Sequence, residues 1–531
     1  MSRTLDNLNP HKNPYIESDT VNAAGFPAFE RPIEERYLQV LLTNSLTGTF
    51  YARSTQLVSQ SLALHAEMAA TAPGFMARAL VYARTEGLMR LQPILGLAYL
   101  AKADHQLFSA VFDRVIRTPG DLADFVEIVR DSAVPGRMGR AVKRAINAWL
   151  NNLSEYHAIK YSRGGQGYSL ADILRLTHPV PVNERQDAIF MWLVDRERWA
   201  AHDEAPLTPQ IAAFEALKRL PTPVAATDAR SLIEVGRLPY EVVTGVVKPD
   251  CELWGYLLRQ MPYLALLRHL NTLQRAGVFN DASQGEYVVG RLSDAEAIRK
   301  AMVLPFQLYA AYVAFEPESP DEKQIQMALV DALEMAFVNM PALGKRVCIA
   351  PDVSGSMSGR LSHQGATRYI DVAAIFAAAL VKSNPNALAL PFDTGILPLS
   401  VSSRDSMVTI ANQVAGKLGG GTAISAPISH LLDNRIQVDT FIGITDNVEW
   451  ATDQSGRTGF LAVWNAYRQE IAPAATAFLL TIAPYPQAVA PPSRSDVHFI
   501  YGWSDAVLKY MALTQNGIED QAASVRRLSI L

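Results

Sequence analysis

The sequence predicts a protein of two parts, an all-helical repeat array followed by a doubly wound α/β domain with a parallel sheet. At 531 residues the chain is too long for one hydrophobic core. From about Glu34 to Leu343, apolar residues recur at helical spacing almost throughout. After Gly344, short apolar runs alternate with helical stretches, which is the pattern of parallel strands covered by helices on both faces.

The composition indicates a globular protein, because 49% of the residues are hydrophobic and 19% are charged. No run of about 18 apolar residues predicts a membrane span, and the polar start of the chain lacks the apolar core of a signal peptide. The two cysteines, Cys251 and Cys348, cannot form a disulfide framework or a cysteine zinc site. We therefore expect a protein of the reducing cytoplasm that makes no membrane contact.

The first part of the chain begins with an arm. Residues 1–30 carry Asn, Pro and Gly without a periodic pattern, and we expect them to pack on the helical part, which spans residues 31–343. The clearest helical stretches are 79–82, 91–101, 122–129, 142–150, 188–194, 211–220, 257–273 and 323–338. Clusters of Pro and Gly separate them. This succession predicts stacked helix pairs, as in a solenoid, although no fixed sequence period is present.

Residues 344–531 carry the alternation of strands and helices. The predicted strands are 347–350, 387–392, 440–445, 477–482 and 497–501, and the predicted helices are 371–382, 407–418, 424–434, 461–469 and 505–513. The strands are nearly all apolar, as expected for a sheet that is covered on both faces. Ligands of such sheets bind at the carboxyl ends of the strands, so we expect functional residues at that edge.

Oxygen-bearing side chains follow the first predicted strand. Asp352, Ser354 and Ser356 place a carboxylate and two hydroxyls on one tight turn. Thr422 follows a run of three glycines and Asp446 follows the strand 440–445, so both can reach the same edge of the sheet. This set suits a hard divalent cation, most readily Mg²⁺. An isolated Asp-x-Ser-x-Ser is common, and the same residues cap helices and form turns, but the order of the segments favours the metal site.

Motifs of catalytic chemistry are missing from the sequence. Two residues after Asp352 stands Ser354, where aspartyl-phosphate enzymes need a second Asp. The chain has no G-x-x-x-x-G-K-[ST], H-E-x-x-H or G-x-S-x-G segment, and its ten histidines show no ligand spacing. We therefore predict that the protein is not an enzyme.

A basic segment stands out in the helical part. Residues 136–175 hold seven basic residues against two acidic ones, in a chain whose net charge is −4. Arg137, Arg140 and Arg144 recur at helical spacing and share one face. They stand at a predicted helix start, where backbone N–H groups and guanidinium groups can hold phosphate together. A solvated helix face is the competing interpretation, and it applies more strongly to a second series, Arg78, Arg84 and Arg90.

The order strand–DxSxS, strand–FD, GGGT–helix and strand–TD resembles the von Willebrand factor A domain with its metal-ion-dependent adhesion site. The resemblance covers about residues 344–531. It implies that the hydroxyls of Ser354, Ser356 and, in some states, Thr422 bind the ion, while Asp352 and Asp446 hold its waters. One coordination position then stays open for a carboxylate of a partner.

In the helical part, the segments 79–84, 139–145, 170–178, 261–271 and 299–308 resemble the TROVE module of the Ro autoantigen family. A TROVE module followed by a von Willebrand A domain is the whole Ro architecture, so the resemblance covers nearly the full chain and suggests a bacterial Ro orthologue. It implies a monomeric ring of HEAT-like repeats closed by the A domain.

In that family, Y RNAs bind an outer surface of the ring, and single-stranded 3′ ends of misfolded noncoding RNAs thread its central hole. Exoribonucleases are partners of the bacterial relatives. Transferred to this chain, the resemblance implies that the Y RNA surface includes the following residues: Arg137, Arg140, Lys143, Arg144, Lys160, Arg163 and His178.

The sequence supports three hypotheses of function. The leading one is a non-enzymatic RNA-binding protein of the Ro type. The second is a protein-interaction module, in which the ion of the A domain captures an acidic residue of a partner and RNA is incidental. The third, a metal-dependent nuclease, is disfavoured because no general base is evident beside an ion held mostly by hydroxyls.

Overall fold

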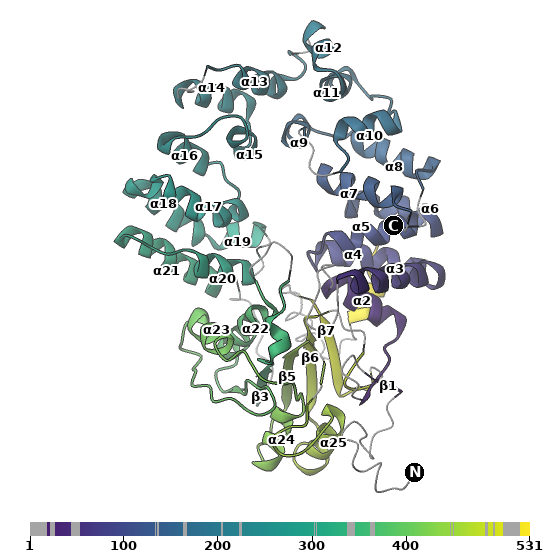
Figure 1. Cartoon of the computed structure of the whole chain (residues 1–531), viewed down its shortest axis with the longest axis vertical. Helices are drawn as coiled ribbons and strands as arrows, with labels where there is room; N and C mark the ends of the chain where they lie inside the picture. Colours follow the sequence, from purple (N-terminus) through teal and green to yellow (C-terminus); the bar gives the residue numbers. More distant parts are fainter. Residues whose placement is uncertain are drawn as a thin grey trace.

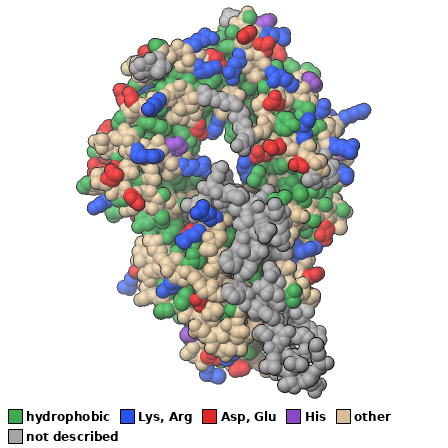
Figure 2. All heavy atoms as spheres, in the orientation of Figure 1, with side chains coloured by type: hydrophobic (Ala, Val, Ile, Leu, Met, Phe, Trp, Pro, Cys, Tyr) green, Lys and Arg blue, Asp and Glu red, His purple; other side chains and the backbone are tan. Residues whose placement is uncertain are grey.

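The computed structural model describes residues 19–21, 27–43, 54–132, 134, 137–162, 167–202, 205–221, 226–301, 303, 305–336, 346–361, 367–446, 448–449, 451–483, 487–491, 494–502 and 521–530. An arc of helices stands on a domain built around a parallel sheet (Figure 1). The two ends of the arc both meet the sheet domain, and the space-filling view shows an opening through the middle (Figure 2). The predicted fold class, a helical array followed by an α/β domain, is confirmed.

The arc is built from short helices that pack on their neighbours in the chain, such as α4 on α5 and α13 on α14. Its helices are α2 (Ile33–Thr43), α3 (Ser54–Thr71), α4 (Pro73–Thr85), α5 (Leu91–Ala103), α6 (His105–Val115), α7 (Pro119–Arg130), α8 (Arg140–Leu150), α9 (Glu155–Lys160), α10 (Leu170–Thr177), α11 (Glu184–Val194), α12 (Arg196–Ala201), α13 (Pro209–Lys218), α14 (Ala226–Gly236), α15 (Tyr240–Thr244), α16 (Cys251–Leu258), α17 (Tyr263–Arg275), η1 (Val278–Asn280), α18 (Ala282–Leu292), α19 (Ala295–Ala301), α20 (Pro305–Ala314) and α21 (Pro320–Met335).

One predicted helix is wrong. The stretch 257–273 was expected to be continuous, but α16 ends at Leu258 and α17 begins at Tyr263. Pro262 lies between them, with φ −58° and ψ 154° at the N-cap of α17. Proline has no N–H to donate, and it disfavours helical backbone in the residue before it. The apolar spacing continues across the break because both helices face the same core.

Among its described residues, the sheet domain contains five parallel strands in the order β4-β3-β5-β6-β7. They are β3 (Val347–Pro351), β4 (Leu388–Ala389), β5 (Thr440–Thr445), β6 (Thr476–Thr481) and β7 (Val497–Tyr501), and the helices are α22 (Tyr369–Ser383), α23 (Met407–Ala415), α24 (Ala426–Asp433), α25 (Phe460–Glu470) and α27 (Gln521–Arg526). β4 is shorter than predicted, although Leu390 and Phe392 still donate backbone hydrogen bonds to β3. The predicted helix 505–513 lies outside the described residues.

Contacts at the start of the arc join it to the sheet domain. Phe29, at the end of the predicted arm, exchanges two backbone hydrogen bonds with Ala488, of 2.9 and 3.0 Å. The Gln39 side chain in α2 donates to the carbonyl of Ala483. The last described segment of the chain lies on α4, where Arg78 donates to the carbonyl of Leu528 at 3.0 Å. Figure 1 accordingly marks the C-terminus beside the first helices.

The end of the arc makes a second junction with the sheet domain. Glu334 in α21 pairs with Lys382 of α22 at 3.0 Å and accepts the backbone N–H of Met407 at the start of α23. The Tyr309 hydroxyl in α20 donates to the Asn412 side chain. The sheet domain therefore closes the arc into a ring. Within the described ranges, no helix has the length and apolar character that crossing a bilayer demands.

Candidate metal centre and basic surface

The predicted metal residues lie near the point where the strand order of the sheet reverses. The chain order of the strands is 2-1-3-4-5 across the sheet, so the connections run to opposite sides between β3 and β5. Such a switch point leaves a crevice at the carboxyl ends of the strands, where ligands bind. Asp352 directly follows β3 and Asp446 directly follows β5. The fold itself therefore brings the two carboxylates together.

Hydrogen bonds fix the orientation of Asp352. One carboxylate oxygen accepts the backbone N–H of Ser354 at 2.9 Å, and the other accepts the Thr445 hydroxyl at 2.7 Å. The Ser354 and Ser356 hydroxyls lie 3.1 Å apart on the following turn. The side chains of Asp352, Ser354, Ser356, Thr422 and Asp446 are all buried, none more than 3% exposed.

The glycine loop closes one side of this cluster. The carbonyl of Gly420 accepts the N–H of Gly355 at 3.0 Å. Gly420 has φ +73°, and a Cβ at this position would lie 2.2 Å from a carboxylate oxygen of Asp393. Only glycine fits both the left-handed backbone and the close approach. The loop thus holds Asp393 beside the metal residues, where its charge acts on Asp352.

Within the described part of the chain, no ion pair compensates the two buried carboxylates, Asp352 and Asp446. Burial raises the pKa of Asp352, and the negative charge of Asp393 adds to that effect, against hydrogen bonds from Ser354 and Thr445. Burial, followed by the charge of Asp352, raises the pKa of Asp446. One oxygen of Asp446, Oδ2, is buried and has no hydrogen-bond partner. Burying such groups without a partner is unfavourable, and a cation between the carboxylates would relieve it.

The donor set fits a hard cation. Two carboxylates and three hydroxyls offer the oxygen ligands that Mg²⁺ prefers, and Mg²⁺ keeps several of its waters. Within the described part of the chain, no three or more His, Cys, Asp or Glu side chains converge as metal ligands would. Hydroxyls must therefore complete any coordination shell at this site. We expected this from the segment DVSGS together with Thr422.

The predicted basic surface lies on α8. Its residues Val142, Ile146 and Leu150 are buried, whereas Arg140 and Arg144 are exposed on the opposite face and Lys143 is half-buried. Arg137, just before the helix, is also exposed. No hydrogen bond or ion pair to these four cationic side chains occurs among the described residues. In Figure 1, α8 lies on the outer edge of the arc, and Figure 2 shows Lys and Arg side chains projecting from that edge.

The remaining predicted RNA residues are placed differently from one another. His178 is exposed, follows α10 in a left-handed conformation with φ +50°, and adjoins α8 because Asn147 donates to the carbonyl of Thr177. Lys160 pairs with Glu241 of α15 at 3.0 Å, and its helix α9 lies at the inner edge of the arc (Figure 1). The structure thus brings His178 to the α8 surface and pairs Lys160 with α15 instead. Arg163 lies outside the described residues.

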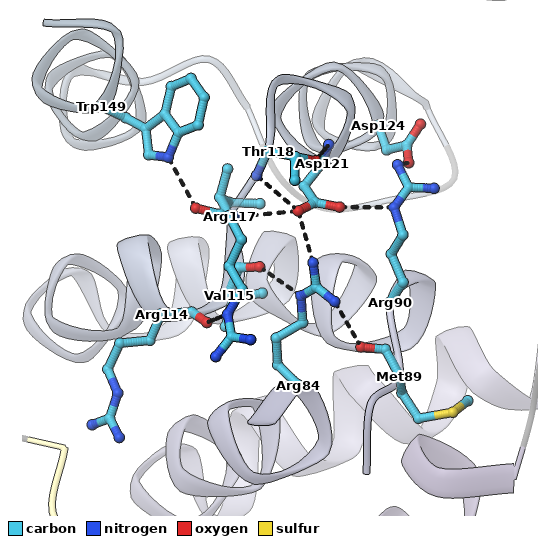
Figure 3. A network of polar contacts seen from close by, with 11 residues as sticks. Arg84, Met89, Arg90, Arg114, Val115, Arg117, Thr118, Asp121, Asp124 and Trp149 are labelled. Atoms are coloured by element: carbon cyan, nitrogen blue, oxygen red, sulfur yellow. Dashed lines mark hydrogen bonds and ion pairs between the residues drawn. The ribbon is translucent and has the colours of Figure 1, made fainter. Parts of the chain in front are cut away.

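The second arginine series is a structural network (Figure 3). Arg84 and Arg90 both pair with Asp121, at 2.8 and 2.7 Å, and Arg84 also donates to the carbonyl of Val115. Burial acts to raise the pKa of Asp121, but the charge of Arg84 and the hydrogen bond from Arg90 hold it below its ordinary value. These arginines link α4, α5 and α7, so Arg84 and Arg90 form neither a phosphate site nor the solvated helix face that the sequence favoured for them.

Comparison with known families gives two matches in the expected order. The model described as the TROVE domain matches residues 248–337, and the model described as the Ro60 vWA domain matches residues 346–512. The chain belongs to the Ro family. Its basic helix α8 and His178 precede the matched TROVE segment, so their place in the family pattern rests on the shorter resemblances in the sequence.

Two curated relatives of this Ro family chain are named RNA-binding protein RO60. The one from Deinococcus radiodurans is 27% identical over 97% of this chain and 100% of its own length. The one from Caenorhabditis elegans is 25% identical over 76% of this chain and 72% of its own length. A solved structure, that of the Deinococcus radiodurans RO (RSR) protein, has a TM-score of 0.66 and 23% identity, over 92% of this chain and 100% of that one. That structure shows the same fold.

Sequence reasoning missed two features of this Ro family protein. Thr445 holds Asp352 through its hydroxyl, and its position directly before Asp446 was the available signal. A pocket between α14, α15 and α16 was also missed. Its walls come from residues spread between positions 156 and 262, so no local motif marks it.

Proposed function

We propose that this chain is an RNA-binding protein that holds structured noncoding RNA on the α8 surface of its ring. The carrying observation is the row of cations from Arg137 to Arg144, exposed or half-buried and without ion-pair partners in the described part of the chain. Cations that lack protein partners are available to phosphates, whereas Arg84 and Arg90 are not. The names of the two curated relatives support this proposal.

The finer proposal follows the Ro family. A Y RNA binds the outer surface formed by α8 and His178, and single-stranded 3′ ends of misfolded noncoding RNAs enter the central opening. Lys160 belongs to α9, which borders that opening in Figure 1, and it pairs with Glu241, so in this proposal it is not part of the α8 surface. The protein has no catalytic role of its own and presents the RNA to exoribonucleases.

The A domain adds a metal centre to this proposal. Asp352, Ser354, Ser356, Thr422 and Asp446 would hold one divalent cation, Mg²⁺, which supplies a positive charge between the buried carboxylates. The alternative function assigns the main role to this centre, with an acidic residue of a protein partner as its target. The five side chains are at most 3% exposed, so a partner would reach them only after local rearrangement. The burial of these five side chains favours the RNA-binding proposal over the protein-interaction alternative.

A gel shift tests the proposal. The pure protein is titrated against a structured RNA with a single-stranded 3′ tail at several salt concentrations, beside an Arg140/Lys143/Arg144→Ala variant. Phosphate contacts release counterions, so we expect the variant to bind at least about tenfold more weakly and its salt dependence to flatten by about 2 to 3 in log–log slope.

A matched variant separates a local site from general charge. Lys102, Arg219 and Lys323 are exposed on the same arc, and their replacement by alanine removes the same charge. We expect this control to change the affinity by less than about threefold, because isolated surface charges are largely screened. Equal losses in both variants would argue against a specific α8 surface. No binding by the wild type would overturn the proposal and leave the protein-interaction alternative.

A further inference from the structure

A pocket in the upper arc has the features of a ligand site. It has a volume of about 330 Å³ and lies between α14, α15 and α16, with Tyr156 of α9 at its wall. Tyr240 and Tyr256 contribute two further aromatic side chains, and Arg237 and Glu234 contribute charges of opposite sign. Of these helices, α9 and α15 border the central opening in Figure 1. The pocket is therefore next to the proposed path of single-stranded RNA.

Tyr240 carries a polar group that the fold does not satisfy. Its side chain is 7% exposed, and its ring packs edge-on against His269 at 5.1 Å between centroids. No hydrogen bond to its hydroxyl occurs in the described part of the chain. The hydroxyl is not one of the buried polar atoms that lack a partner, so it is accessible at the wall of the pocket and can donate to or accept from a ligand.

Arg237 provides an available cation at the same place. It follows α14 with φ +45°, a left-handed conformation that side-chain-bearing residues rarely adopt. The turn is held by the N–H of Leu238, which donates to the carbonyl of Ile233 at 3.0 Å. The guanidinium is exposed and has no ion-pair partner among the described residues. It suits a phosphate that lies at the mouth of the pocket.

The acidic residues of the pocket indicate which class of ligand it can bind. Glu234 accepts the Tyr256 hydroxyl at 3.2 Å, and Glu241 pairs with Lys160 at 3.0 Å. Both carboxylates keep further acceptor capacity, since each has about four lone-pair sites. Acceptors beside aromatic faces suit a flat ring that carries N–H donors. Two carboxylates also disfavour a bare phosphate inside the pocket, although Arg237 can hold one at the mouth.

We propose that this pocket binds one unpaired nucleobase with an exocyclic amino group, from a single-stranded RNA segment in the central opening. The ring of the base stacks on tyrosine, its amino group donates to Glu234, and the adjoining phosphate pairs with Arg237. Adenine and cytosine meet this requirement, whereas uracil lacks the amino group. The inference rests on the proposed function and adds a base preference to it.

Fluorescence anisotropy with labelled ten-nucleotide A10, C10 and U10 tests the inference. We expect the wild type to bind A10 and C10 about tenfold more tightly than U10, because one well-placed base contact discriminates by about that factor. Glu234→Gln should remove most of this preference. Tyr156→Leu should weaken the binding of all three strands by about tenfold through loss of stacking.

Matched controls use exposed residues of the same arc outside the pocket. Glu286→Gln makes the same chemical change as Glu234→Gln and should behave as the wild type. Arg237→Gln should weaken the binding of all three strands, whereas Arg219→Gln, its matched control, should not. Binding of the structured RNA through α8 checks that each variant is folded. If A10, C10 and U10 bind alike, or if Glu234→Gln matches Glu286→Gln, the pocket inference is overturned while the gel shift still supports the proposed function. If no RNA of any kind binds, both fall.

Discussion

At the scale of single residues, the metal centre depends on Asp446. This carboxylate is buried at the end of β5, and one of its oxygens has no hydrogen-bond partner. A cation that binds only the folded protein stabilises it by mass action, by about 2.7 kcal/mol at one hundred times its dissociation constant. We therefore expect Mg²⁺ to raise the melting temperature of the wild type by a few degrees. Differential scanning fluorimetry with and without Mg²⁺ measures this.

The Asp446→Asn variant should lose that response. Glu470→Gln, an exposed carboxylate-to-amide change on α25 of the same domain, should retain it. Sodium chloride of matched ionic strength serves as the control for general salt effects. An unchanged Mg²⁺ response in Asp446→Asn would exclude this residue from the ion's site.

His65 makes stability depend on pH. It is fully buried, accepts the Tyr37 hydroxyl at 2.9 Å and donates to Gln92 at 2.9 Å, so it is neutral with the proton on Nε2. Burial lowers its pKa to about 4, partly offset by the hydrogen bond to Gln92. The unfolded chain therefore binds an extra proton between pH 6.5 and 4, and the folded state loses stability as the pH falls through that window. The total loss is about 3 kcal/mol.

Unfolding experiments from pH 7.5 to 4.5 test this sign. We expect wild-type stability to fall by as much as about 1.4 kcal/mol per pH unit through this one group. His65→Gln should be less stable than the wild type at pH 7.5 but should show a flatter dependence. Parallel pH curves for the two proteins would contradict the assignment.

Single residues could be predicted from the sequence where the pattern that marks them lies within a few positions. Asp352, Ser354 and Ser356 lie within five positions at the end of a strand, so the sequence alone indicated their chemistry. The contact of Lys160 could not be predicted in this way. Its partner Glu241 lies 81 positions away in the chain, and only the packing of α9 on α15 brings the two together. No local motif in the sequence marks Tyr240, because the pocket that it lines forms only where several helices come together.

At the scale of elements, the glycine loop 419–421 has two positions with opposite requirements. A Cβ at Gly420 would lie 2.2 Å from Asp393 on a backbone with φ +73°, whereas a Cβ at Gly419 would meet nothing within 4 Å. We expect Gly420→Ala to destabilise the sheet domain by about 2 kcal/mol or more, because it combines a clash with left-handed strain. Thermal melts of the two alanine variants measure this.

Gly419→Ala serves as the matched control and should stay within about 0.5 kcal/mol of the wild type. It makes the same substitution one residue away. Equal melting temperatures for the two variants would show that the loop relaxes freely around Gly420.

Elements of the sheet domain were predicted better than those of the arc. The strands β5 and β7 have the bounds that the sequence indicated, because a strand covered on both faces forms a short and mostly apolar run. In the arc, the spacing of apolar residues continues through the break at Pro262. This spacing indicates which face of a helix is buried, but it does not indicate whether the backbone is continuous. β4 came out short because only Leu388 and Ala389 pair with β3 as a regular strand.

At the scale of the whole molecule, the sheet domain is held at two junctions. One joins Arg78 of α4 to the carbonyl of Leu528, and the other joins Glu334 of α21 to Lys382 and the start of α23. We expect arc and sheet domain to unfold in one calorimetric transition, since each stabilises the other at both ends. An Arg78→Met/Glu334→Gln variant, which removes one side chain from each junction, should lower this transition by more than either single variant does.

Each single variant weakens only one junction and should show a single transition that is less strongly lowered. Differential scanning calorimetry distinguishes these cases. A wild-type protein that already melts in two well-separated steps would show that the junctions do not couple the parts.

The closed ring also acts as a topological constraint. While both junctions hold, a polymer enters the opening only by threading a free end through it. Under the proposed function, a covalently circular RNA therefore cannot enter the opening whatever its sequence, and a linear RNA with a bulky fold on each side of the ring cannot leave it. Its release needs either the melting of one of those folds or the opening of a junction, so dwell time on the protein is governed by unfolding rates and not by affinity.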